Sequence, residues 1–258
     1  MNLFLLKLIL APIILGSASL AGRRWGSAIS GWLVGLPLTS GPAIFILALN
    51  HDLTFVVNAI RGTLSGGFSL MAYTLVYAWI SRKYDWRVAI VGSIFIFAAM
   101  TMILQNVVIS FIPLFFFIIL TIFLGLWLMP KSEPIYKEIS TPGPWDIPAR
   151  ILVGTSFLLF ITWIASYVGP QLTGLLTTIP LYTSILTIFA HREQGHAGAN
   201  GVLRGLIFGL FAFAGFYLVL GLLIERASIA VSFGAATLAS LGVQGLTLLI
   251  LKPTRTSS

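Results

Sequence analysis

The sequence predicts an all-α polytopic membrane protein with about nine transmembrane helices in two inverted-topology repeats, whose second and seventh helices are broken. Of its 258 residues, 58% are hydrophobic and only 9% are charged, whereas soluble domains carry about a quarter charged residues. Mean hydropathy is +1.01. Apolar runs of about 20 residues, the length that a helix needs to cross a bilayer, recur from end to end. Two proline-containing segments with a similar order of polar residues lie in the two halves.

The apolar runs are continuous rather than alternating, which favours helices over the strands of a transmembrane β-barrel. The first run, 2–21, ends in small residues as a signal peptide does, but it has no basic start, so we interpret it as a span. The stretch 87–129 would be about 64 Å long as a single helix, which is far more than a bilayer needs. Gln105, Asn106 and Pro113 offer a place to turn, and we divide it there. The predicted spans are 2–21, 28–50, 54–81, 87–106, 109–129, 150–167, 170–190, 197–223 and 228–251.

The basic residues test this count. With nine spans and an outside N-terminus, the outside loops hold only Arg226. This asymmetry follows the positive-inside rule and predicts a bacterial plasma (inner) membrane protein with a cytoplasmic C-terminus. The net charge of +8 therefore reflects loops between spans, and no nucleic-acid partner is expected. The basic residues of the inside loops are Arg23, Arg24, Arg82, Lys83, Arg87, Lys131, Lys137, Arg150, Arg192, Lys252 and Arg255.

A hydrophilic segment divides the chain. Residues 130–149 are rich in proline and carry charges of both signs, which is typical of a connector. We expect a first membrane repeat plus an extra helix over 1–129, a cytoplasmic connector over 130–149, and a second membrane repeat over 150–258.

Both halves contain a hydroxyl pair, a proline, a His with a nearby acid, and an Arg-Gly pair one span later. The second and seventh predicted spans are five spans apart, an odd number, so they cross the membrane in opposite directions. Inverted repeats are a signature of secondary transporters, whose site lies at the repeat interface near the midplane. The matched residues are Thr39, Ser40, Pro42, His51, Asp52 and Arg61 in the first half, and Thr177, Thr178, Pro180, His191, Glu193 and Arg204 in the second.

The segments GLPLTSGPAIF and AIRGTLSGG resemble the core of GlpM-type small bacterial inner-membrane proteins. The resemblance covers about 30–107 and, more faintly, 170–251. Those proteins are single four-span units with a proline-containing second helix and an Arg that opens the third. The resemblance implies two fused repeats and no particular biochemical role.

The second span contains the helix-breaking residues Pro37, Gly41 and Pro42, and the seventh contains Pro180. Proline removes a backbone donor and clashes with the preceding turn. Broken backbone survives in lipid only where protein or water covers it. We therefore predict two broken helices that meet near the midplane and form a polar pocket. The alternative is an ordinary kink whose freed groups bond internally. The predicted substrate-binding hydroxyls are those of Thr39, Ser40, Thr177 and Thr178.

Arg61 and Arg204 each lie about two turns into a predicted span, from opposite sides. A charge at that depth is a functional candidate, and the guanidinium fork suits a carboxylate or phosphate. We predict that they bind the substrate beside two gates, His51 with Asp52 and His191 with Glu193. The alternative is that they snorkel or pair with Asp52 and Glu193. We expect Lys7, the third cation within a span, to snorkel.

Other residue types exclude several functions. The chain has no cysteine, which excludes disulfides and thiolate sites. None of the seven acidic residues lies deep in a span, and His51, His191 and His196 are scattered. We therefore expect no catalytic residues, no metal and no cofactor.

Small residues predict close helix packing at the spacings Gly31-Gly35, Gly201-Gly205 and Gly205-Gly209. The aromatic span 109–129 should face lipid or a second copy of the chain, which leaves a homodimer open.

The sequence thus predicts a secondary transporter that moves an anionic small molecule or a lipid-linked phosphate by alternating access. The alternative is a non-catalytic accessory or structural subunit of a membrane complex. The expected partners are the lipid bilayer and the anion.

Overall fold

The computed structural model describes residues 3–104, 107, 109–131, 145–165 and 180–251, and for 3–8, 10, 157–159 and 161–165 it describes the backbone only. Every regular element in this part of the chain is helical. Four of the helices are long and apolar enough to cross a membrane, as expected of a helical membrane protein. The helices are α1 (Leu3–Trp25), α2 (Ser27–Val34), α3 (Ser40–Asn50), α4 (Leu53–Ile80), α5 (Trp86–Leu104), α6 (Phe111–Leu128), α7 (Asp146–Ala165), α9 (Leu181–Leu223) and α10 (Ile229–Ile250).

The helices follow the predicted spans closely. The chain leaves its helical path between α5 and α6, where the stretch 87–129 was expected to turn. The connector ends earlier than expected, because α7 already begins at Asp146. Helix α9 contains a sharp change of direction at Gly195, with φ 68° and ψ −161°, a backbone conformation that glycine adopts at little energetic cost. Its second segment, 196–223, has the position of the eighth predicted span. Its first segment, 181–194, overlaps the seventh predicted span only over 181–190, because 170–179 lie outside the described residues.

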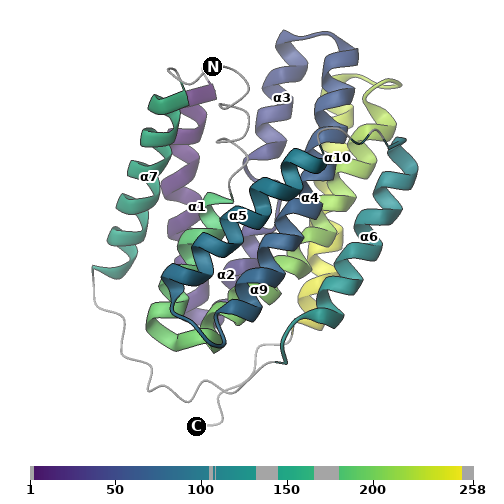
Figure 1. Cartoon of the computed structure of the whole chain (residues 1–258). Coiled ribbons are helices and arrows are strands. Elements are labelled where there is room, and N and C mark those ends of the chain that lie inside the picture. Colours follow the sequence, from purple (N-terminus) through teal and green to yellow (C-terminus); the bar gives the residue numbers. More distant parts are fainter. Residues whose placement is uncertain (1–2, 105–106, 108, 132–144, 166–179, 252–258) are drawn as a thin grey trace.

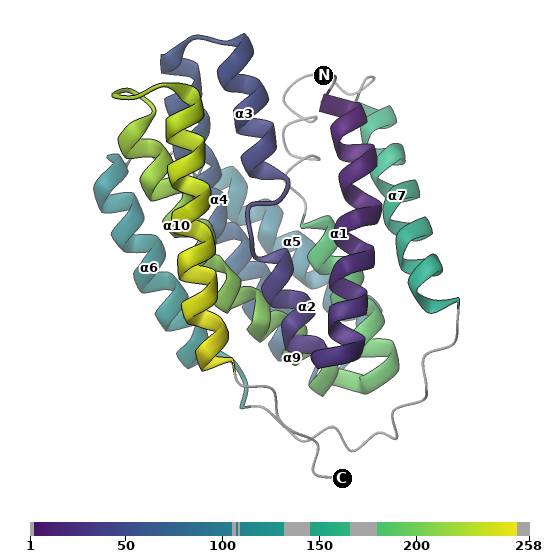
Figure 2. The ribbon, with the colours of Figure 1, turned by 180° about the vertical axis from the view of Figure 1, so that it is seen from behind.

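Helix α9 lies at the centre of the bundle (Figures 1 and 2). On one side it packs with α1, α2 and α7, and on the other with α4, α6 and α10. The larger hydrophobic cluster includes Tyr73 and Tyr77 of α4 together with Leu210 and Tyr217 of α9. A smaller cluster joins α1 to the start of α9, and Leu33 and Val34 of α2 pack against it.

Large apolar side chains cover the outer surface. Trp127 of α6 is 80% exposed and Phe95 of α5 is 75% exposed. Extensive apolar exposure is unusual for a soluble protein and suits contact with lipid. The exposed face of α6 is equally compatible with a second copy of the chain, so the homodimer stays a prediction.

Candidate functional site

The second predicted span is interrupted between α2 and α3, and Pro37 explains why. In a continuous helix the Leu33 carbonyl would accept a hydrogen bond from the backbone nitrogen of residue 37, which in proline carries no hydrogen. The backbone N–H of Leu36 donates a hydrogen bond to the Leu33 carbonyl oxygen instead, at 3.3 Å. The N–H of Leu38 then donates to the Leu36 carbonyl at 2.8 Å, in a tight turn around Pro37.

This rearrangement frees the carbonyl of Trp32, whose expected donor, Leu36, is now used elsewhere. Helix α10 supplies another hydrogen-bond donor for the Trp32 carbonyl. The side-chain amide of Gln244 donates to the Trp32 carbonyl oxygen at 2.8 Å, and the Trp32 indole N–H donates to the Thr247 hydroxyl at 3.0 Å. A freed backbone group in apolar surroundings is thus satisfied by a distant side chain, as the bilayer requires.

The other residues predicted to break helices have different positions. Gly41 and Pro42 lie in the first turn of α3, where proline is tolerated because backbone N–H groups there lack helical partners. Pro180 precedes the first residue of α9. Of the predicted hydroxyls, Thr39 and Ser40 lie at the start of α3, whereas Thr177 and Thr178 lie outside the described residues.

Several buried polar atoms lie near the break. The Tyr217 side chain is fully buried, and its hydroxyl lies close to that of Ser40 without forming a hydrogen bond to any described residue. On α10, the Gln244 carbonyl oxygen and the Ser240 hydroxyl are likewise buried without a described partner. These two residues are four positions apart, so they share one face of the helix. The break is therefore lined by polar atoms that have unused bonding capacity.

A pair of tyrosines tests this description. The Tyr73 hydroxyl lies 2.9 Å from that of Ser184, which itself donates to the Pro180 carbonyl at 2.8 Å. Tyr73→Phe should therefore lower the free energy of unfolding by about 1 kcal/mol. Tyr217→Phe should leave it unchanged or raise it, because burying an unbonded hydroxyl is unfavourable. Thermal unfolding in detergent measures both. An equal loss for Tyr217→Phe would show that its hydroxyl is hydrogen-bonded after all, to the nearby Ser40 or to a residue outside the described part of the chain.

Glycines hold the interrupted helix against α9. The predicted spacings Gly31-Gly35 and Gly205-Gly209 lie on facing surfaces of α2 and α9. A methyl group at Gly205 would collide with the backbone carbonyl of Ala28, and one at Gly35 would collide with the backbone of Gly209. The predicted close approach is confirmed: the two backbones are in direct contact.

Arg61 lines a cavity of about 140 Å³ between α4, α6 and the end of α9, near the Asp52 end of the bundle. Its buried Nε atom has no hydrogen-bond partner among the described residues. Arg226 and Glu225 complete the polar lining, and the apolar lining includes Phe111 and Leu222. Two guanidinium groups and one carboxylate leave a positive balance, which favours an anion.

The residues of the first predicted gate, His51 and Asp52, lie at the junction between α3 and α4. His51 ends α3 and stacks on Phe55, with ring centroids 4.4 Å apart. Asp52 caps α4 by accepting a hydrogen bond from the backbone N–H of Phe55 at 2.8 Å. This is a common role for aspartate at a helix start.

At the second predicted gate, Glu193 pairs with Arg150 rather than with Arg204. One terminal nitrogen of Arg150 contacts both Glu193 carboxylate oxygens, at 2.7 and 2.8 Å. Arg204 is half-buried on α9, with no hydrogen bond or ion pair to the described residues. His191, two positions before Glu193, lies with its Nδ1 3.3 Å from the Tyr77 hydroxyl.

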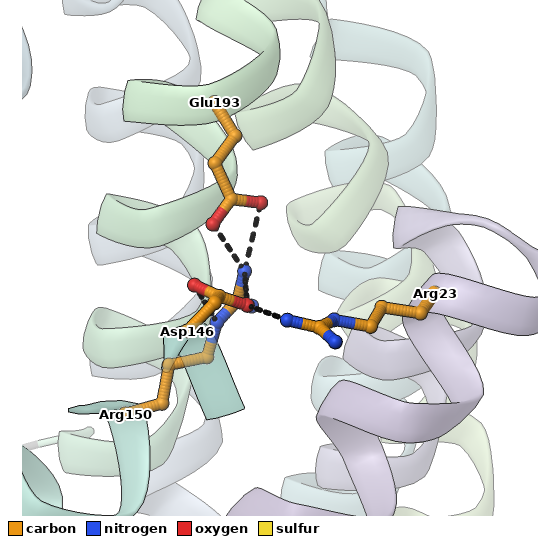
Figure 3. A network of polar contacts seen from close by, with 4 residues as sticks. All are labelled: Arg23, Asp146, Arg150 and Glu193. Atoms are coloured by element: carbon orange, nitrogen blue, oxygen red, sulfur yellow. Dashed lines mark hydrogen bonds and ion pairs between the residues drawn. The ribbon is translucent and has the colours of Figure 1, made fainter. Parts of the chain in front are cut away.

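Arg150 is the centre of a partly buried ionic network that joins three helices, in which Asp146 and Glu193 are half-buried and Arg23 is exposed (Figure 3). Arg150 is only 7% exposed. Its Nε donates to Asp146 at 3.1 Å, and Arg23 of α1 donates to the same carboxylate at 2.9 Å. Burial alone would raise the pKa of Asp146, but the hydrogen bonds that it accepts from the guanidinium groups of Arg150 and Arg23 hold that pKa below its ordinary value.

Arg23 and Arg150 were both predicted to lie in inside loops, without a predicted partner. Only the spacing of Asp146 and Arg150, four residues apart in a helical stretch, indicates part of the network in advance.

Among the described residues, no three His, Asp or Glu side chains gather where they could hold a metal ion. Comparison of the chain with protein-family models, curated proteins and solved structures gave no match. The function is therefore inferred from the residues of this chain alone.

Proposed function

We propose that this protein is a bacterial inner-membrane secondary transporter for an anionic small molecule or a lipid-linked phosphate, working by alternating access between two inverted repeats. The observation that carries the proposal is the Arg61 cavity, a space for a small anion beside a guanidinium group whose buried Nε has no described partner. Arginine is the side chain best suited to recognise a carboxylate or phosphate.

The interrupted helix supports the same function. Discontinuous helices near the bilayer midplane commonly form transporter sites, and here the half-buried Ser40 lies at the break close to the buried Tyr217 hydroxyl, with the buried polar atoms of Ser240 and Gln244 on α10. The polar atoms at the break would bind uncharged groups of the substrate, while Arg61 attracts its charge. Arg204, from the second repeat, would do the same on the other side.

The Arg150 network would form the gate at the Arg23 end of the bundle, which we expect to be cytoplasmic from the positive-inside rule. It joins α1, α7 and the first segment of α9, so opening on this side would separate Glu193 from Arg150. The His191 pair with Tyr77 lies beside the same turn of α9 and would open with it.

The test is ligand-dependent thermal stability of the purified protein against organic anions and lipid-like phosphates. A ligand at 100 times its Kd stabilises the folded state by about 2.7 kcal/mol. We expect one anion class to stabilise the wild type. Arg61→Gln should weaken that binding by roughly tenfold to a hundredfold, because a hydrogen bond to a charged group contributes about 1.5–3 kcal/mol.

Arg87→Gln is the matched control, since it removes an exposed cation at the start of α5 and should not alter binding. Tyr217→Phe tests the break separately, and Arg204→Gln tests the second repeat. Uptake of the stabilising anion into proteoliposomes then distinguishes transport from binding. Equal binding by wild type and Arg61→Gln, or binding without uptake, would contradict the proposal.

The accessory-subunit alternative has one specific observation in its favour. The Gln244 amide satisfies the carbonyl that the break frees, as an internally bonded kink would require. On this alternative no anion stabilises the protein, although all four variants fold normally.

A further inference from the structure

A second pocket lies where α4 and α6 end, on the side of the bundle opposite Asp52. It has a volume of about 440 Å³ and is lined by Trp79, Arg82, Trp127, Leu128 and Lys131, together with Met129 and Pro130. It is distinct from the Arg61 cavity. Arg61 and Arg82 are 21 positions apart along α4 and its C-terminal turn, which separates them by about 30 Å along the helix axis.

Contacts between the two helix ends hold the pocket in shape. The Trp79 indole N–H donates to the Leu128 carbonyl oxygen at 3.0 Å, which ties the end of α4 to the end of α6. The Arg82 guanidinium lies 5.5 Å from the centre of the Trp79 ring, a cation–π arrangement. One cation is thus positioned at the pocket before any ligand binds.

The surroundings of the pocket match a membrane–water interface. Trp127 and Trp79 are exposed at the ends of helices, and the face of α6 that leads to them exposes Phe116, Leu120 and Phe123. Tryptophan and basic residues gather at the level of lipid headgroups, and an exposed apolar helix face suits acyl chains. A lipid lying along α6 would therefore place its headgroup in the pocket.

The charges specify the class of lipid. Both ionisable residues that line the pocket, Arg82 and Lys131, are basic, and the exposed Lys83 and Arg87 lie at the same end of the bundle. We propose that this pocket binds the headgroup of an anionic phospholipid, with the phosphate between Arg82 and Lys131 and the acyl chains along α6. Basic residues near a membrane surface each contribute to the attraction of anionic lipids.

The test is lipid binding by the purified full-length protein in uncharged detergent, measured by native mass spectrometry. Phosphatidylglycerol, phosphatidylcholine and free glycerol phosphate are titrated separately. At about 1 kcal/mol per basic residue, Arg82→Gln/Lys131→Gln should bind phosphatidylglycerol roughly thirtyfold more weakly than the wild type. Lys83→Gln/Arg87→Gln removes the same charge from the same end outside the pocket lining and should retain nearly full binding.

A second readout avoids any dependence on folding of the charge variants. Phosphatidylglycerol with brominated acyl chains should quench the fluorescence of the wild type, and Trp127→Phe, a change at an exposed side chain, should lower that quenching, while Trp79, which lines the same pocket, accounts for part of the remainder. Equal loss in the two charge pairs would overturn the proposal, because it would indicate general surface attraction. Equal binding of phosphatidylcholine, or tight binding of free glycerol phosphate, would also overturn it.

Discussion

Gly205→Ala should lower the midpoint of thermal unfolding by roughly 2–12 °C. The added methyl group meets the carbonyl of Ala28 and the backbone nitrogen of Trp32, and backbone atoms cannot rotate away as a flexible side chain can. Helix α2 would have to move off α9. Overpacking of this kind destabilises by about 1–3 kcal/mol, and each kcal/mol corresponds to about 2–4 °C in a chain of this size. Circular dichroism in detergent measures the change.

Gly242→Ala on α10 is the matched control. A methyl group at Gly242 meets no described atom within 4 Å, so alanine should be neutral or should stabilise the helix by up to about 1 kcal/mol. If Gly205→Ala were tolerated as well as Gly242→Ala, the direct backbone contact between α2 and α9 would be wrong. The break at Pro37 would then lose the contact that holds it in the bundle.

Arg150→Met should lower the free energy of unfolding by about 3–5 kcal/mol, the range found when one partner of a buried ion pair is removed. The substitution keeps an unbranched apolar side chain but leaves Glu193 without its bidentate partner. It also leaves Asp146 with Arg23 as its remaining cation in the network. Urea or thermal unfolding in detergent measures the loss.

The double variant Arg150→Met/Glu193→Leu distinguishes the stability that the ion pair contributes from the stability that an unpaired buried charge removes. Replacing both partners by apolar residues is often neutral, so the double variant should recover much of the stability that Arg150→Met loses. Strictly additive losses, with no coupling in the double-mutant cycle, would contradict a direct interaction between the two side chains. A double variant that regains stability but does not transport the anion would identify the pair as a functional gate.

The helices themselves were predictable from local sequence. Apolar runs of bilayer length specify helices because no other regular backbone satisfies its own hydrogen bonds in lipid, and α4, α6 and α10 begin and end within two residues of the predicted spans. The break at Pro37 follows from the missing N–H of a single residue. The packing of Gly31 and Gly205 was predictable because small residues at this spacing have few other uses. The nine-span count and the inverted repeat stay predictions.

The partners of the polar side chains were decided by the tertiary structure. Glu193 was predicted to act with Arg204, yet it binds Arg150, which lies 43 positions away in sequence. The carbonyl freed at Trp32 finds Gln244, 212 positions away, and Arg61 meets Arg226 in a cavity that neither segment indicates alone. Helical propensity and the proline break act within one turn of the chain, so sequence determines them. A hydrogen bond or ion pair between distant residues depends on how whole helices rotate and approach, and only their packing decides that.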